Sequence, residues 1–372
     1  MLIRTVRIPL AVLLLLLAIV SVTPAADITE AARMQNSGDV TAIPTRAGWM
    51  ASGSHRITVL TPEQTVVFTR KVKRNQRLIY SEHGEYFGIL KYNDHSPTTI
   101  SLLRLEVFGH SGELIWSVKK PQATSFVLSD GSPYAVGIVG AEGIPQSELH
   151  LYSGSGEYKI SQIVSHLFGV SFRSDGEYLF VNSADSGLAA FDTSGNQVHH
   201  FGQANKYCVS DDGRHVALMN SNGLSYFKDG VRIKSLEIDL DNTNPAVAMR
   251  FDSRLLFLAV LYRNGLNVHR LPTLELAWEE RDKSGTRRFT SLDYSLDGLL
   301  AVGFDIPSKQ DGKKVHTQGG VGLFDQAGTR LWSLELDYSA WTREFPMVCF
   351  TTDGKGLQIA TADEALLYTI SR

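Results

Sequence analysis

The sequence predicts an all-β fold, a β-propeller of seven four-stranded blades whose ring is closed by an N-terminal strand in the last blade. Two observations carry this prediction. One unit recurs about every 45 residues from Trp49 to the C-terminus, a period typical of propeller blades. In its clearest copy, Val170 to Phe201, an apolar run is followed by an Asp-Gly turn and by further β-rich runs.

A glycine turn marks each copy of the unit. Asp-Gly between two β-rich runs supplies the positive φ angles that a tight hairpin turn needs. One copy has lost the glycine and carries Leu255 at the turn instead. The other turns are His83-Gly84, Asp130-Gly131, Asp175-Gly176, Asp212-Gly213, Asp297-Gly298 and Asp353-Gly354. Seven such turns predict seven blades.

Strand patterns agree with packed sheets. Runs such as Tyr178–Val181 and Leu299–Val302 are apolar on both faces, as expected for a sheet between neighbouring sheets. We expect Thr65–Arg70 to be the strand that completes the last blade and so closes the ring. The run Ile57–Leu60 then has no place, which leaves an eighth, partial blade open as an alternative.

The N-terminal residues have a different composition. Arg4 and Arg7 precede an apolar run, Ile8–Val22, and small residues follow at Thr23–Ala26. This pattern is typical of a secretory signal peptide. An uncleaved anchor is the alternative, but the run falls short of the roughly 20 residues that span a bilayer. We expect a signal peptide at 1–26, a polar leader at 27–48 and the propeller at 49–372, in a periplasmic or extracellular protein whose mature chain has no transmembrane segment.

Several segments resemble known propeller repeats. Phe172 with the following Ser-Asp-Gly-x-Tyr-Leu resembles WD-repeat and TolB-like units, and Tyr178–Val198 is similar to the YVTN repeats of exported propellers. Phe108–Trp116 and Phe324–Trp332 resemble the tryptophan-docking repeats of quinoprotein-like propellers. Trp-Asp dipeptides are absent, and only two Gly-x-x-x-Trp copies exist. The resemblance implies a propeller, and a fold alone does not assign a function.

Composition excludes some classes of function. The net charge of −3 argues against a nucleic-acid-binding protein, which is usually strongly basic. Quinoprotein-like enzymes commonly hold their cofactor with adjacent cysteines and with carboxylates that bind calcium, whereas Cys208 and Cys349 stand alone in distant units. We expect these two thiols to pack as small apolar groups on first strands, with no disulfide between them. We expect no cofactor and no metal, and a monomeric propeller.

Catalytic motifs are missing from the sequence. There is no Gly-x-Ser-x-Gly elbow and no His-Glu-x-x-His motif. His199 and His200 are adjacent in a strand, so their rings should point to opposite faces. Paired carboxylates remain the alternative, because such pairs need not be close in sequence. The acidic candidates for this alternative site, all expected in loops, are Asp94, Glu142, Asp185 and Asp305.

Basic residues cluster on one predicted surface. The link 70–77 is the densest basic run, and a seven-blade ring would place it beside the long loop Asp305–Gly320 of the sixth unit. The candidate binding residues are Lys71, Lys73, Arg74, Arg77, Arg287, Arg288, Lys309, Lys313, Lys314, His316 and Arg343. A cationic patch would suit a protein or an anionic polymer as partner. The other interpretation is a solvated rim balanced by nearby acids.

These observations favour a non-catalytic binding or scaffold module of the cell envelope or extracellular space. Its protein or anionic ligand would bind on the face that carries the loops between second and third strands. The alternative is an extracytoplasmic propeller enzyme that acts on a carbohydrate or small molecule through loop carboxylates, with or without calcium.

Overall fold

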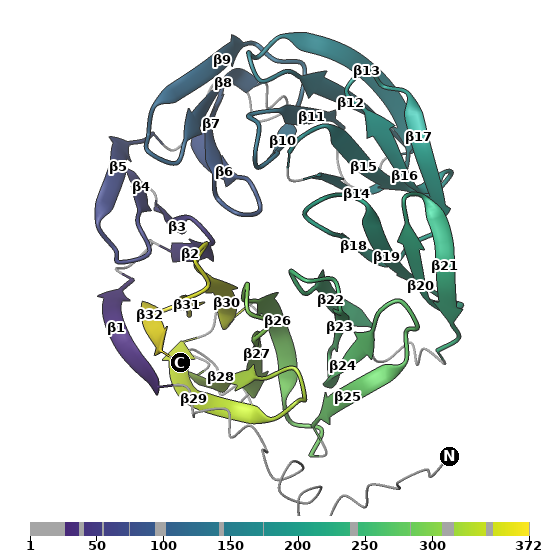
Figure 1. Ribbon diagram of the computed structural model, residues 1–372. Coiled ribbons are helices and arrows are strands. Elements are labelled where there is room, and N and C mark those ends of the chain that lie inside the picture. Colours follow the sequence, from purple (N-terminus) through teal and green to yellow (C-terminus); the bar gives the residue numbers. More distant parts are fainter. Residues whose placement is uncertain are drawn as a thin grey trace, which may run out of the picture.

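The computed structural model is a ring of eight antiparallel sheets, each of four strands (Figure 1). It describes residues 27–36, 41–53, 56–73, 75–93, 102–140, 145–173, 175–238, 245–282, 284–306, 316–339 and 345–371. Among these residues, no helix has the length and apolar character needed to span a membrane.

The first four blades follow one another in chain order, each from its innermost to its outermost strand. Blade 1 contains β2 (Thr41–Thr45), β3 (Gly48–Ser52), β4 (Arg56–Leu60) and β5 (Val66–Lys71). Blade 2 contains β6 (Gln76–Tyr80), β7 (Tyr86–Tyr92), β8 (Leu102–Gly109) and β9 (Leu114–Lys119). Blade 3 contains β10 (Ser125–Leu128), β11 (Ala135–Val139), β12 (Gln146–Tyr152) and β13 (Tyr158–Ser165). Blade 4 contains β14 (Leu167–Phe172), β15 (Tyr178–Ser183), β16 (Gly187–Asp192) and β17 (Gln197–Gly202).

The remaining blades continue the pattern, and the last one takes a strand from the N-terminal end. Blade 5 contains β18 (Lys206–Val209), β19 (His215–Asn220), β20 (Gly223–Lys228) and β21 (Val231–Leu236). Blade 6 contains β22 (Ala246–Phe251), β23 (Phe257–Tyr262), β24 (Gly265–Arg270) and β25 (Leu276–Arg281). Blade 7 contains β26 (Arg288–Tyr294), β27 (Leu300–Ile306), β28 (His316–Phe324) and β29 (Arg330–Ser339). Blade 8 contains β30 (Met347–Phe350), β31 (Gly356–Ala360), β32 (Glu364–Ser371) and β1 (Asp27–Gln35).

The prediction of seven blades is wrong, and so is the predicted closing strand. The chain is closed by β1, which pairs antiparallel with β32 from Asp27 opposite Ser371 to Gln35 opposite Glu364 (Figure 1). The segment Thr65–Arg70 instead lies largely in β5 and pairs with β4. Residues 27–48, predicted as a polar leader, therefore supply two strands, β1 and β2, and the unplaced Ile57–Leu60 belongs to the complete blade 1.

The hydrophobic core lies between neighbouring blades. Side chains on both faces of the middle strands are buried, as in β15, where Leu179, Phe180 and Val181 all have exposed fractions of 7% or less. A single buried cluster joins blades 7, 8 and 1 and includes Trp49 and Phe350. Burial on both faces explains why these strands read as continuous apolar runs.

The predicted turns join the first and second strands of their blades. The glycines of the Asp-Gly turns have positive φ, for example 78° at Gly176, a conformation that glycine adopts without steric cost. Leu255, where the glycine is lost, has a φ of 56° and so keeps the same turn with a strained residue. The repeat is preserved there in backbone shape although not in sequence.

A second glycine turn docks each of several blades on the blade before it. Gly156 has a φ of 79°, and a Cβ atom placed on it would lie 2.8 Å from the ring of Trp116 on the outermost strand β9. The Trp116 Nε1–H donates to the Pro133 carbonyl at 2.8 Å. Gly328 lies against Trp278 in the same way. Trp116 therefore packs from an outermost strand, and Trp332 lies on β29, with its ring centroid 5.0 Å from that of Tyr368.

Candidate functional site: a charged cavity at the channel mouth

The ring has two faces, and the antiparallel order of the strands places different turns on each. Turns between first and second strands lie at one end of the blades, here named the first-turn face. Turns between second and third strands lie at the other end with the links between blades, here named the second-turn face. The sequence directs attention to the second-turn face, whereas the charged cavity described below lies at the first-turn face.

Many predicted site residues fall outside the described part of the chain. Those outside it are Arg74, Asp94, Glu142, Lys309, Lys313, Lys314 and Arg343. Of His316, only the backbone at the start of β28 is described. The predicted basic surface as a whole therefore stays a prediction.

The described basic residues lie in two separate places. Lys71 ends β5, Lys73 follows it, and Arg77 lies in β6, so all three belong to the junction of blades 1 and 2. Arg287 and Arg288 lie at the start of blade 7, and blades 8 and 1 stand between the two groups. The eight-blade ring does not bring them together.

Three of these arginines contact side chains of their own blades. The guanidinium of Arg77 lies 5.5 Å from the ring centroid of Tyr92, and that of Arg287 lies 4.7 Å from the ring centroid of Phe304. Arg288 Nε lies 3.7 Å from Asp305 Oδ1. Each of these guanidinium groups thus already has a partner in its own sheet.

The two described acidic candidates are also apart. Asp305 is buried in strand β27, so its predicted place in a loop is wrong. Asp185 is exposed in the turn between β15 and β16, in blade 4. No group of three or more His, Cys, Asp and Glu side chains within the described ranges is arranged to hold a metal ion.

A cavity of about 420 Å³ opens at the channel mouth on the first-turn face. Five of its polar lining residues come from the same part of the repeat, the turn after the innermost strand. They are Arg46, Glu82, Asp130, Asp211 and Ser253, from blades 1, 2, 3, 5 and 6. The propeller repeat therefore gathers polar side chains from several blades around the mouth.

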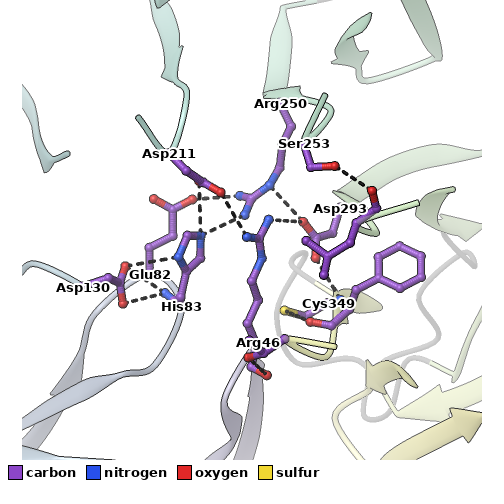
Figure 2. A network of polar contacts seen from close by, with 12 residues as sticks. Arg46, Glu82, His83, Asp130, Asp211, Arg250, Ser253, Asp293 and Cys349 are labelled. Carbon is purple, nitrogen blue, oxygen red and sulfur yellow. Dashed lines mark hydrogen bonds and ion pairs between the residues drawn. The ribbon is translucent and has the colours of Figure 1, made fainter. Parts of the chain in front are cut away.

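Two ion pairs cross the channel between opposite blades (Figure 2). Arg250, on β22 of blade 6, places Nη1 2.8 Å from Glu82 Oε1 of blade 2. Arg46 of blade 1 places Nη1 3.4 Å from Asp211 Oδ2 of blade 5. In a ring of eight, blade 6 faces blade 2 and blade 5 faces blade 1, so both pairs span the mouth.

One buried carboxylate, that of Asp293, contacts both arginines. The side chain of Asp293 on β26 is 4% exposed, and its Oδ1 lies 2.9 Å from Arg250 Nε and 3.7 Å from Arg46 Nη2. Its Oδ2 accepts the Phe350 N–H at 2.8 Å. Burial works to lower the pKa of Arg250, but Asp293 and Glu82 outweigh it and hold that pKa above its usual value. The guanidinium group of Arg250 is thus fixed and charged.

Two neighbouring carboxyl groups respond in opposite directions. Arg250 lowers the pKa of Glu82. Burial raises the pKa of Asp130, against the opposing effect of His83. The His83 N–H donates to both oxygens of Asp130 at 3.1 Å, and its ring lies 3.7 Å from Asp130 and 3.9 Å from Asp211. The mouth therefore holds one carboxyl group that stays ionised and one that binds a proton more readily.

Replacing Asp130 with Asn is expected to change how stability depends on pH. Because folding raises the pKa of Asp130, the folded chain binds this proton more tightly than the unfolded chain. The resulting stabilisation is present below the unfolded value of about 4 and is lost as pH rises through the folded pKa. Urea unfolding at pH 7 and pH 4 measures the free energy of unfolding of both proteins. The stability of the wild type relative to Asp130→Asn should be greater at pH 4 than at pH 7. Equal differences at both pH values would contradict this effect.

The two cysteines are free thiols on innermost strands, as predicted. Cys208 lies on β18 in blade 5 and Cys349 on β30 in blade 8. Burial raises the pKa of both thiols. They are therefore in the thiol form at neutral pH and are poor nucleophiles.

The sequence contains a signal for the charged mouth that the predictions did not use. Cys208 and Cys349 align with Ser171 when the units are superposed on their turns, and the same alignment places Arg250 and Asp293 at that position. Charged residues in innermost strands indicate groups that point into the channel. Which of them meet across it depends on the number of blades, which the turns alone do not give.

Comparisons with solved structures give the fold. The chain matches a eukaryotic initiation factor structure at a TM-score of 0.54 and 12% identity, covering 91% of this chain and 85% of that chain. It matches the Dos1 propeller at a TM-score of 0.52 and 11% identity, covering 92% and 95%. It matches the dihydro-heme d1 dehydrogenase NirN at a TM-score of 0.53 and 15% identity, covering 82% and 67%.

These likenesses show the β-propeller fold alone, because all three identities are low. No protein-family model and no curated protein sequence matches the chain.

Proposed function

We propose that this chain is a non-catalytic binding module that works outside the cytoplasm and takes a small polar ligand into the cavity at the first-turn face. The observation that carries the proposal is the cavity of about 420 Å³ crossed by two ion pairs from opposite blades. Small-molecule sites typically measure about 300–1,000 Å³ and contain a few convergent polar groups. The N-terminal pattern of Arg4, Arg7 and Ile8–Val22 supports export.

The arrangement favours binding because the arginines are anchored while the carboxylates that they contact are accessible. Glu82 and Asp211 have side chains that are 63% and 61% exposed, whereas the arginines they contact are 23% and 18% exposed. Exposed ion pairs contribute only about 0–1 kcal/mol, and each pair here has one exposed partner, so a ligand that offers new partners to both charges can separate them at small cost. The anchored arginines would keep their positions when the acids move.

A thermal-shift screen of chemically diverse, water-soluble compounds against the full chain tests the proposal. We expect at least one compound class to raise the melting temperature of the wild type, because a ligand that binds only the folded state stabilises it. The shift should disappear in the double variant Glu82→Gln/Asp211→Asn, which keeps the shape of both side chains. It should persist in the control Asp185→Asn, whose side chain is exposed at the second-turn face. Shifts of equal size in the double variant, or no shift with any class, would refute a ligand site at the mouth.

An enzyme that acts on a carbohydrate or small molecule is the second candidate function, and one observation favours it. Glu82 and Asp130, from neighbouring blades, have pKa values moved apart by their surroundings, the pattern found in acid–base pairs. In this role Asp130 would donate a proton and Glu82 would stay ionised. A screen of glycoside substrates would support it if turnover fell at least 100-fold in Asp130→Asn. Turnover that survives this substitution would reject it.

A further inference from the structure

The two ion pairs across the channel mouth restrict the ligand. One guanidinium nitrogen of Arg46 and one of Arg250 lie near Oδ1 of the buried Asp293, as Figure 2 shows. The Nη1 atom of each arginine instead contacts an exposed carboxylate from the opposite blade, Asp211 or Glu82. Only the contacts with Asp211 and Glu82 are open to exchange, because Asp293 is itself held by the Phe350 N–H.

A ligand of one charge would leave part of the mouth uncompensated. An anion that took the place of Asp211 and Glu82 on the arginines would leave these two carboxylates beside Asp130 without their cations. A cation that took the place of the arginines on the acids would leave two largely buried guanidinium groups with only Asp293 between them. The first exchange leaves like charges close together, and the second leaves guanidinium groups that are largely withdrawn from water without their partners, so both are unfavourable.

A molecule that carries both charges avoids this loss. Its carboxylate can accept two parallel hydrogen bonds from a guanidinium, the geometry that arginine favours. Its ammonium group can donate to the exposed carboxylates, so that both arginines and both exposed carboxylates keep an opposite charge beside them. The net charge of the site is then unchanged by binding.

We propose that the mouth binds a zwitterion, an α-amino acid or a short peptide, with its carboxylate on Arg46 and Arg250 and its ammonium group on Glu82 and Asp211. This inference rests on the proposed function, since it names the ligand class for the same cavity. The cavity of about 420 Å³ has room for either source of this chemistry.

Calorimetry on the full chain with matched probes tests the inference. The probes are leucine, the dipeptide Ala-Ala, N-acetyl-Ala-Ala, which keeps only the carboxylate, and Ala-Ala amide, which keeps only the ammonium group. We expect leucine or Ala-Ala to bind at least 10-fold more tightly than both blocked dipeptides. Tighter binding of leucine than of Ala-Ala identifies a free amino acid as the source, and the reverse order identifies a peptide.

Variants assign the binding to the mouth. Glu82→Gln and Asp211→Asn are shape-preserving changes of exposed side chains, and each should weaken zwitterion binding at least 5-fold. Asp185→Asn, on the opposite face, should leave the affinity unchanged. Equal affinity for a zwitterion and one of its blocked forms would overturn the inference, as would failure of every probe to bind. The proposed function survives either result if another compound class stabilises the wild type but not Glu82→Gln/Asp211→Asn.

Discussion

A chain that lacks residues 27–36 is expected to lose most of its stability. Without β1, blade 8 keeps only β30, β31 and β32, and the ladder from Asp27–Ser371 to Gln35–Glu364 disappears. Each backbone hydrogen bond contributes about 0.5–1.5 kcal/mol, so the loss reaches several kcal/mol against a typical total of about 5–15. Ile28 and Met34 also pack against the core cluster of blades 7, 8 and 1. Calorimetry should show the melting temperature falling by about 10 °C or more.

The side chain of Arg33 provides the matched control for this deletion. Arg33 Nη1 lies 2.8 Å from Glu364 Oε2 across the same pair of strands, in an exposed ion pair. Arg33→Ala keeps the backbone ladder and should cost less than about 1 kcal/mol. A deletion variant that melts as cooperatively and at the same temperature as the wild type would show that β1 does not close the ring.

Asp293→Ala is expected to be among the most destabilising single changes at the channel mouth. It removes the buried carboxylate that faces Arg46 and Arg250 and leaves the Phe350 N–H without its acceptor. Removing one partner from a buried charge cluster typically costs about 3–5 kcal/mol. The free energy of unfolding in urea measures the loss.

Two further variants separate charge from shape at this position. Asp293→Asn keeps an acceptor for Phe350 and should lose less stability than Asp293→Ala. Adding Arg250→Met to Asp293→Ala removes one of the stranded charges and should recover part of the loss. Asp293→Ala with wild-type stability would mean that the two arginines do not depend on this carboxylate.

The repeat predicts the blades well, because each blade repeats the same turn chemistry. Turns with positive φ and strands that are apolar on both faces are local features, and the structure confirms these turns in blades 2 to 8. Even Leu255 keeps the turn at a φ of 56°. The same alignment places Cys208 and Cys349 on innermost strands.

Blade 1 and the closing strand escape the pattern for physical reasons. The turn of blade 1 is Ala47-Gly48, which lacks the aspartate, and β2 contains Pro44, a residue tolerated in a strand only at a sheet edge. The strand β1 is outermost and most of its side chains are exposed, so its sequence is as polar as a leader. Its identity as a strand comes from pairing with β32, a contact between the two ends of the chain.

The prediction of seven blades also prevented prediction of the candidate site. Arg46 and Asp211, like Glu82 and Arg250, meet only because their blades face each other across a ring of eight. In a ring of seven no blade lies directly opposite another. The charged mouth is therefore a consequence of ring closure that no local motif reports.

A disulfide crosslink between β1 and β32 tests this closure most directly. Thr29 and Thr369 are exposed register partners, so Thr29→Cys/Thr369→Cys should form an intramolecular disulfide on mild oxidation, detected by mass spectrometry of the digested chain. The native thiols lie on innermost strands and have raised pKa values, so they should not compete for the disulfide. Thr69→Cys/Thr369→Cys, which would join the ends of a seven-blade ring closed by residues 65–70, should stay reduced. The reverse result, a bond from residue 69 and none from residue 29, would contradict the eight-blade ring and the channel-mouth site that depends on it.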